Sequence, residues 1–247
     1  AMFRPGRILQ FGGNSSGALV IDINGTQPVV TATQAMSSQR YWVTGTVLPN
    51  GTVLATGGSR VDNELTDVNN SAEIWNPATG QWHAGTSGAT PRLYHSSALL
   101  LQAGKVLVAG GGAPGPVYNL NAEIYSPPYL FNASGNAATR PQIVNAPSAA
   151  DVGTTLSIEV DTTDISRVTL VKTGSVTHSW NMEQRFQDLT FNANGAQVSV
   201  QAPTRAAFAP PGHYLLFVFN SAGVPSVARI LRIGVAADPN PAITPTL

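Results

Sequence analysis

The chain has 247 residues, enough for one or two domains with a substantial buried core. Basic and acidic residues number 13 each, so the formal net charge is +0, and no basic cluster marks a nucleic-acid or anionic-membrane surface. Charged residues make up only 11%, while 24 Gly and 18 Pro interrupt the sequence, which is typical of many short strands joined by turns. Composition therefore favours an all-β protein with a neutral partner.

The absence of cysteine and of long apolar runs excludes further classes of protein and of metal site. The chain contains no cysteine, so it offers neither a disulfide framework nor a thiolate metal site. No apolar run approaches the roughly 20 residues of a membrane-spanning helix, and we expect no membrane partner. Sequons of the form N-x-S/T, which fit an extracellular, secreted protein, begin at Asn14, Asn24, Asn50, Asn69 and Asn132.

A repeated phrase of turn, apolar strand and Gly pair dominates the first half of the chain. Its three copies are PGRILQFGG (5–13), NGTVLATGG (50–58) and AGKVLVAGG (103–111). The Gly pairs begin at positions 12, 57 and 110, and the spacings of 45 and 53 residues match the period of propeller blades and of kelch repeats in particular. A further strand follows each pair: ALVIDI (18–23), SAEIWNP (71–77) and NAEIYSP (121–127).

These repeats predict about three kelch-type blades over residues 1–138. A blade cannot bury both of its faces alone, and three blades do not close a ring. We therefore expect the missing blades to come from an upstream part of the same precursor or from another chain.

The second half of the chain follows a different pattern. Residues 126–147 are rich in Pro, Asn and Ala, as in a linker. Beyond them, β-rich runs alternate with turns at 154–160, 167–173, 196–203, 213–221 and 227–233. No convincing amphipathic helix interrupts this pattern, which predicts an immunoglobulin-like β-sandwich over residues 139–235 and a loosely held tail at 236–247. The predicted fold is all-β, an incomplete ring of propeller blades followed by a sandwich.

Two of the four histidines lie in settings that suit metal chemistry. His95 follows Tyr94 just ahead of an apolar strand, and His178 lies where a β-branched strand gives way to polar residues, as at the tip of a loop. Their donors can meet only if the loop of His178 reaches from the sandwich to the propeller. His83 and His213 lie in plainer strand contexts, and we assign them structural roles.

Several phrases resemble, in the same order, the copper radical oxidases, which include galactose oxidase and glyoxal oxidase. They are PRLYHSSALLLQAGKVLVAGGG, NAEIYSPPYLF, THSWNMEQR and APPGHYLLFVFNSAGVPSVARI. The resemblance implies copper as the cofactor, with Tyr94 as its axial ligand and His95 and His178 as equatorial ligands. It also implies an oxidase that converts a primary alcohol, aldehyde or carbohydrate with O2 and releases hydrogen peroxide. Imidazoles suit Cu(II), and a weakly held phenol oxygen can accept the substrate's hydroxyl proton.

The sequence departs from the family at the tyrosine that carries the radical and is cross-linked to a cysteine. Nine residues before Gly51, where the family has this tyrosine, stands Trp42, and Tyr41 lies one residue earlier. Adjacent strand residues point to opposite faces, so only a slip or bulge would let Tyr41 serve. Otherwise the radical centre is lost and Trp42 serves in packing. The family's cysteine would fall upstream of residue 1.

Four more residues attract smaller hypotheses. Gln184 and Arg185 match the family's QR pair, and we expect them either to brace the histidine loop or to occupy an exposed turn. Arg40 and Arg92 each precede a strand near the expected mouth of the site, and we expect them either to bind substrate hydroxyls or to be solvated.

Three functions stay open on the sequence. The first is the copper oxidase, and the second is a non-catalytic module that binds glycan or protein and has lost the radical residue. The third is a partial domain that becomes active only with further blades. These functions differ in whether the protein binds copper and whether it catalyses an oxidation.

Overall fold

The computed structural model describes residues 1–234, so the tail expected at 236–247 lies outside the described residues. The described part contains 22 strands and a single 3-10 turn at Pro128–Leu130. The all-β fold predicted from composition is confirmed.

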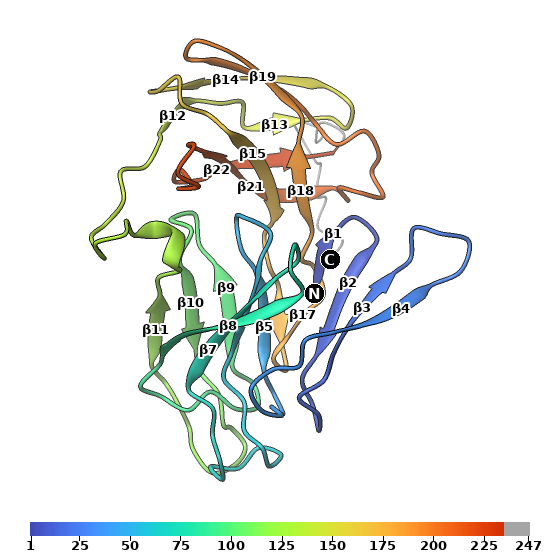
Figure 1. Cartoon of the computed structure of the whole chain (residues 1–247), viewed down its shortest axis with the longest axis vertical. Coiled ribbons are helices and arrows are strands. Elements are labelled where there is room, and N and C mark those ends of the chain that lie inside the picture. Colours follow the sequence, from blue (N-terminus) through green and yellow to red (C-terminus); the bar gives the residue numbers. More distant parts are fainter. Residues whose placement is uncertain (235–247) are drawn as a thin grey trace, which may run out of the picture.

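Three antiparallel sheets, arranged as neighbouring blades, form the part of the molecule drawn in blue to green in Figure 1. Their strands are β1 (Met2–Arg4), β2 (Arg7–Phe11), β3 (Ala18–Asp22) and β4 (Val29–Thr33); β5 (Thr44–Val47), β6 (Val53–Thr56), β7 (Ser71–Asn76) and β8 (Gln81–Ser87); and β9 (Ser97–Leu100), β10 (Val106–Ala109) and β11 (Ala122–Tyr125). Within each sheet, successive strands pair with one another in sequence order. The repeated phrases of the sequence lie on β2, β6 and β10.

The Gly pairs that end these phrases permit close backbone approach between neighbouring segments. Gly57 and Gly58 have φ of 71° and 94°. A Cβ on Gly57 would lie 2.6 Å from the carbonyl oxygen of Arg92, and one on Gly58 would lie 2.6 Å from that of Tyr41. Only glycine fits both the backbone conformation and the space.

The rest of the chain forms two packed sheets, with strand orders β12-β14-β20-β19 and β13-β22-β21-β15-β18. The strands are β12 (Ile143–Asn145), β13 (Ala149–Ala150), β14 (Thr155–Val160), β15 (Arg167–Lys172), β18 (Phe186–Leu189), β19 (Phe191–Asn194), β20 (Gln197–Gln201), β21 (Gly212–Phe219) and β22 (Arg229–Ile233). Alternating apolar residues of both sheets, such as Ile158, Val198 and Leu216, form the core between them. The predicted domain boundary at residue 138 falls between β11 and β12.

A hairpin leaves the sandwich between β15 and β18 and enters the blade region. Its strands are β16 (Val176–Thr177) and β17 (Trp180–Asn181). β16 packs against β9 and β17 against β5, the first strands of the third and second blades. In Figure 1 this segment, drawn in pale orange, descends from the sandwich among the blades.

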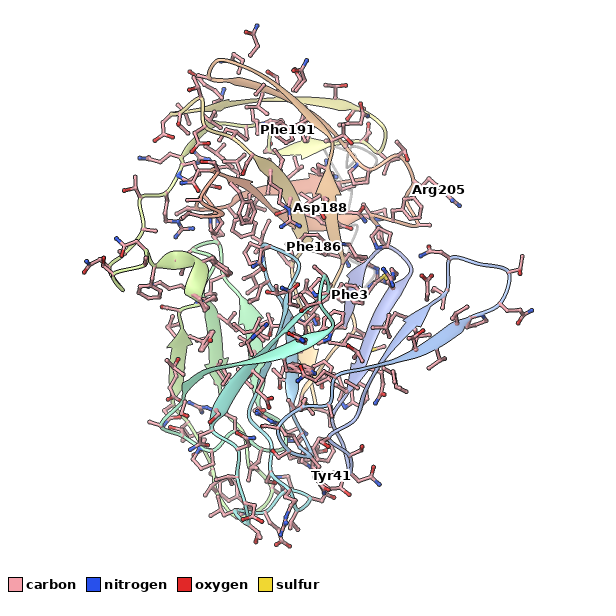
Figure 2. All side chains as sticks on the ribbon, viewed as in Figure 1. Phe3, Tyr41, Phe186, Asp188, Phe191 and Arg205 are labelled. Carbon is pink, nitrogen blue, oxygen red and sulfur yellow. The ribbon has the colours of Figure 1, made fainter. Side chains whose placement is uncertain are left out.

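The blades and the sandwich also share one hydrophobic core. A single cluster joins Phe3 and Leu9 of the first blade to Phe186 and Phe217 of the sandwich. Figure 2 shows Phe3 and Phe186 near the junction, with Tyr41 at the opposite end of the blades. The buried Thr169 hydroxyl donates a 2.8 Å hydrogen bond to the carbonyl of Pro49 across the junction. The two parts therefore pack as one body.

Candidate metal centre

The blade side of the centre is the segment between β8 and β9. His95 has φ of 65°, a left-handed conformation that is uncommon outside glycine. Its Nδ1 lies 2.8 Å from the carbonyl oxygen of Ala113. A carbonyl only accepts, so Nδ1 carries the proton and Nε2 keeps its lone pair for a metal. The Tyr94 ring stacks on the imidazole, with centroids 3.8 Å apart.

The sandwich side is the tip of the β16–β17 hairpin. Thr177 pairs with Trp180, so His178 and Ser179 form a two-residue turn, with φ of 54° and 63°. Left-handed values at both central residues define the type I′ turn that suits a tight hairpin. The Thr177 hydroxyl lies 2.6 Å from His178 Nδ1, and when this hydroxyl accepts the Nδ1 proton, Nε2 of the ring keeps its lone pair for a metal.

The three aromatic rings converge on one place. The centroids of His95 and His178 are 4.6 Å apart, and those of Tyr94 and His178 are 5.6 Å apart. Metal–nitrogen bonds are about 2 Å long, so one ion can reach both imidazoles at this separation. Among the described residues, no group of three or more His, Cys, Asp or Glu side chains is placed to hold a metal ion, and the third ring beside the two imidazoles is the phenol of Tyr94. Two imidazoles with a phenol fit Cu(II).

The serines that follow the two histidines join the two loops. Ser96 and Ser179 are both buried, and their hydroxyl oxygens are 3.3 Å apart. The sequence carries a sign of this pairing that our sequence reasoning did not use, because both histidines occur in a His-Ser dipeptide. The contact fixes the hairpin tip beside the His95 segment.

Gln184 attaches the base of the hairpin to β5. Its side chain is buried, its Oε1 accepts a 2.5 Å hydrogen bond from the N–H of Val47, and its Nε2 donates at 2.8 Å to the carbonyl of Gly45. Of the two expectations for Gln184, the geometry matches bracing. Arg185 is half-buried and donates to the carbonyls of Met182 and Gln184, so it closes the hairpin on itself.

Trp42, and not Tyr41, contacts the centre. The backbone does not run as a continuous strand through both residues, because Trp42 has φ of 60° and forms a turn before β5 begins at Thr44. This turn brings the indole to a centroid distance of 4.4 Å from the Tyr94 ring. Tyr41 forms an isolated bridge with Ser59. Within residues 1–234, no ring contact joins Tyr41 to Tyr94 or to either histidine ligand candidate.

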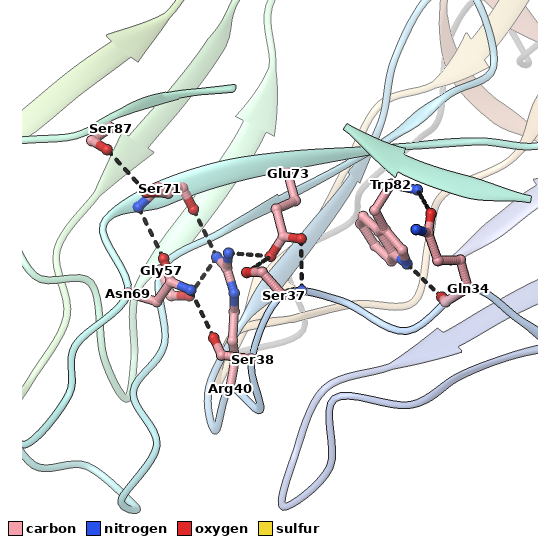
Figure 3. Close-up of polar contacts among 10 residues, drawn as sticks. All are labelled: Gln34, Ser37, Ser38, Arg40, Gly57, Asn69, Ser71, Glu73, Trp82 and Ser87. Carbon is pink, nitrogen blue, oxygen red and sulfur yellow. Dashed lines mark hydrogen bonds and ion pairs between the residues drawn. The ribbon is translucent and has the colours of Figure 1, made fainter. Parts of the chain in front are cut away.

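The expectations for Arg40 and Arg92 are both corrected by burial. Arg40 is fully buried, pairs with Glu73 and donates a 2.8 Å hydrogen bond to the carbonyl of Ser71, as Figure 3 shows. Arg92 is 4% exposed and pairs with Glu123 at 2.8 Å. Each arginine thus binds the glutamate of an AEI strand, and neither is solvated or free for substrate. Burial cannot be read from a sequence alone, so the sequence did not reveal that both guanidinium groups pair with glutamates.

His83 and His213 lie apart from the centre. Both side chains are exposed, His83 on the outer strand β8 and His213 on β21 of the sandwich.

Two further residues near the centre carried no signal in the sequence beyond their place in a polar loop. Asp62 accepts a hydrogen bond from the Trp42 indole, and Asn63 bonds to the backbone N–H of Tyr94. Both contacts span 20 residues or more of sequence, so local patterns do not reveal them.

Comparison with known proteins agrees with this architecture. Residues 140–233 match the family described as Galactose oxidase-like, Early set domain. Galactose oxidase of Gibberella zeae is 36% identical over 245 residues, which cover 92% of this chain and 36% of that protein. Aldehyde oxidase GLOX1 of Arabidopsis thaliana is 32% identical over 263 residues, covering 94% of this chain and 42% of that protein.

A solved structure shows the same fold over almost the whole chain. It is that of a fungal alcohol oxidase of the AA5 family in complex with copper, with a TM-score of 0.89 and 27% identity. The match covers 95% of this chain but 53% of the other, so the chain spans only part of the proteins it resembles. Among the described residues, no helix has the length and apolar character to cross a membrane. By sequence and by fold, the chain belongs to the family of galactose oxidase and glyoxal oxidase.

Proposed function

We propose that Tyr94, His95 and His178 bind copper, and that the chain is the copper-binding part of a secreted oxidase. Its substrate is a primary alcohol, an aldehyde or a carbohydrate that carries such a group. The observation that supports this is the meeting of the three rings, brought together by a hairpin that crosses from the sandwich into the blades. The relatives with this fold carry oxidase names, and one was solved with copper.

The residues of the chain have distinct roles in this reaction. Copper, when bound, supplies a one-electron redox centre that also acts as a Lewis acid. His95 and His178 bind it through Nε2, since each Nδ1 faces an oxygen of the protein. Tyr94 accepts the hydroxyl proton of the substrate on its phenol oxygen. The alcohol loses two electrons and two protons to become an aldehyde, and O2 gains both to become hydrogen peroxide.

The second oxidisable residue comes from Tyr41 or from outside these residues. The family's radical tyrosine is cross-linked to a cysteine, and the 247 residues contain none. Tyr41 has no ring contact with the three ligand candidates within the described residues. We favour a tyrosine and a cysteine supplied by further blades, with Trp42 as an aromatic neighbour of the ligands.

Exposed apolar side chains support further blades. Val30 of the first blade is 58% exposed and Ile124 of the third is 51% exposed. On the hairpin, Trp180 and Met182 are 63% and 73% exposed beside the site. Apolar faces of this kind are normally covered in a propeller. The chain also spans only 36% of galactose oxidase of Gibberella zeae.

Copper stoichiometry and the EPR spectrum of the Cu(II)-loaded protein test the site, with His178→Ala as the variant and His213→Ala, an exposed histidine of the sandwich, as the control. We expect one copper with a nitrogen-rich tetragonal signal in wild type and in His213→Ala, and loss of the signal in His178→Ala. Equal binding by His178→Ala would overturn the site.

Peroxide release from primary alcohols and aldehydes then separates the oxidase from a non-catalytic binding module that keeps its ligands. The same assay, repeated with the further blades present, distinguishes the oxidase and the binding module from a partial domain that is active only with those blades. Copper binding without peroxide in the completed protein would favour the binding module.

A further inference from the structure

The loop between β6 and β7, residues 59–68, reaches the metal centre through two neighbouring side chains. Asp62 accepts a hydrogen bond from the indole N–H of Trp42 through Oδ1. Asn63 accepts from the backbone N–H of Tyr94 at 3.3 Å and donates to the carbonyl of Pro114 at 2.8 Å. This loop therefore contacts Trp42 beside the Tyr94 ring, the backbone of Tyr94 itself and, through Pro114, the segment that carries the hydrogen-bond acceptor of His95.

The loop is closed at its own base, so it can hold these contacts. Arg60 pairs with Asp67 at 2.9 Å, and Ser59 forms a bridge with Val68. The backbone N–H of Arg60 also donates to the carbonyl of Asp67 at 3.2 Å. A loop fixed at its base is a suitable support for side chains that must be placed accurately.

Trp42 needs such a support. Its left-handed backbone, with φ of 60°, is strained for a bulky residue, and strain of this kind persists only where the surroundings over-determine it. The indole N–H is held by Asp62, while the ring lies 4.4 Å from the Tyr94 ring at an interplanar angle of 56°. Asp62 therefore fixes the indole that the phenol of Tyr94 packs against.

We propose that Asp62 is a positioning residue that acts through Trp42 to set the orientation of the Tyr94 ring. This proposal rests on the proposed function for its meaning in catalysis, because Tyr94 is there a ligand and a proton acceptor. The physical claim concerns the protein without metal as well. The carboxylate holds the indole, and the indole holds the phenol.

A double-mutant cycle in the intact protein tests the chain of contacts. Fluorotyrosine labelling gives 19F NMR signals for 6 tyrosines, and the Tyr94 signal is assigned by its loss in Tyr94→Phe. In the metal-free protein, we expect Asp62→Ala to shift the Tyr94 signal. We expect Asp62→Asn, which keeps an acceptor oxygen, to restore it largely. In a Trp42→Phe background, Asp62→Ala should add little, because the indole N–H is already absent.

Glu64→Ala is the matched control, since it removes an exposed carboxylate from the same loop and should leave the Tyr94 signal in place. Equal shifts from Asp62→Ala with and without Trp42 would overturn the proposal, as would an unmoved Tyr94 signal in Asp62→Ala.

Cu(II) titration forms a separate readout. We expect Asp62→Ala to weaken Cu(II) binding about 10-fold, as is usual for partners that orient a ligand, and Glu64→Ala to leave it unchanged. If wild type binds no Cu(II), the proposed function fails, while the metal-free 19F result still decides whether Asp62 positions Tyr94.

Discussion

Backbone strain is concentrated in the residues of the candidate centre. Trp42, His95, His178 and Ser179 all have positive φ, and only two other non-glycine residues among residues 1–234 share this conformation. Strain of this kind costs about 1–3 kcal/mol per residue. The centre is therefore built from backbone conformations that glycine would adopt more easily.

Substitution of one ligand candidate in two ways measures this strain. His95→Ala and His95→Gly remove the same imidazole, but glycine relaxes the left-handed backbone, so we expect His95→Gly to be more stable by about 1 kcal/mol. Urea unfolding of the metal-free variants gives the difference. At His83, in the extended strand β8, the order should reverse, since glycine weakens a strand interior. The same order at both positions would contradict the explanation.

We expect Gln184 to contribute more to stability and to Cu(II) binding than its neutral side chain suggests. Gln184→Ala leaves the buried N–H of Val47 and the half-buried carbonyl of Gly45 without their partner, which we expect to cost about 2 kcal/mol of unfolding free energy. It also frees the hairpin base, so Cu(II) binding should weaken. Chemical denaturation and Cu(II) titration check both, with the exposed Gln81→Ala of β8 as the unaffected control. A variant that unfolds like wild type would show that water replaces both bonds.

At the scale of elements, each AEI strand is tied to the segment that leads into a blade. In the third blade, burial raises the pKa of Glu123, but the N–H of Ala89 and the guanidinium of Arg92 lower it by more. The pKa therefore lies below its ordinary value in the folded protein. The ionised carboxylate stabilises the fold above the unfolded pKa of about 4.3, and this stability is lost as pH falls through the folded pKa.

Glu123→Gln isolates this contribution. We expect the variant to be less stable than wild type near neutral pH and the difference to shrink as pH falls below about 4.3. Denaturation midpoints measured from pH 6 to pH 3 check it. A difference that stays constant with pH would mean that the carboxylate charge contributes nothing and that only packing is lost.

The elements themselves were largely readable from the sequence, because strand patterns are local. The apolar core of PGRILQFGG became β2 (Arg7–Phe11), and HYLLFVFNS became β21 (Gly212–Phe219). The Tyr94, His95 and His178 set came from a family resemblance and stays a prediction for metal binding, although the structure brings the rings together. The turn at Trp42 had no signal, since nothing local favours positive φ at a tryptophan. The buried pairing of Arg40 depends on contacts over 33 residues of sequence.

At the scale of the whole molecule, the blades and the sandwich depend on one core. Phe186 is 1% exposed and belongs to the cluster that also contains Phe3 and Leu9. We expect Phe186→Ala to cost about 3–5 kcal/mol and to lower the stability of both parts in a single unfolding transition. Calorimetry with a blade-specific and a sandwich-specific probe checks it. Phe131→Ala, at a side chain that is 42% exposed, should change stability by less than about 1 kcal/mol. Two separate transitions, with only one shifted, would contradict a shared core.

The hairpin that carries His178 also implies that synthesis and docking of the C-terminal half precede metal binding. Ser96 and Ser179, which join the two loops that carry the ligand candidates, are 83 residues apart in the chain. During synthesis the blades emerge from the ribosome before the hairpin has been made. A chain truncated before residue 178 lacks one of the three candidate metal ligands. We therefore expect copper to be captured only by a chain whose C-terminal half has been synthesised and docked. On the proposed function, an unfinished chain would therefore lack one of its copper ligands, and it could not hold the metal before its C-terminal half has folded.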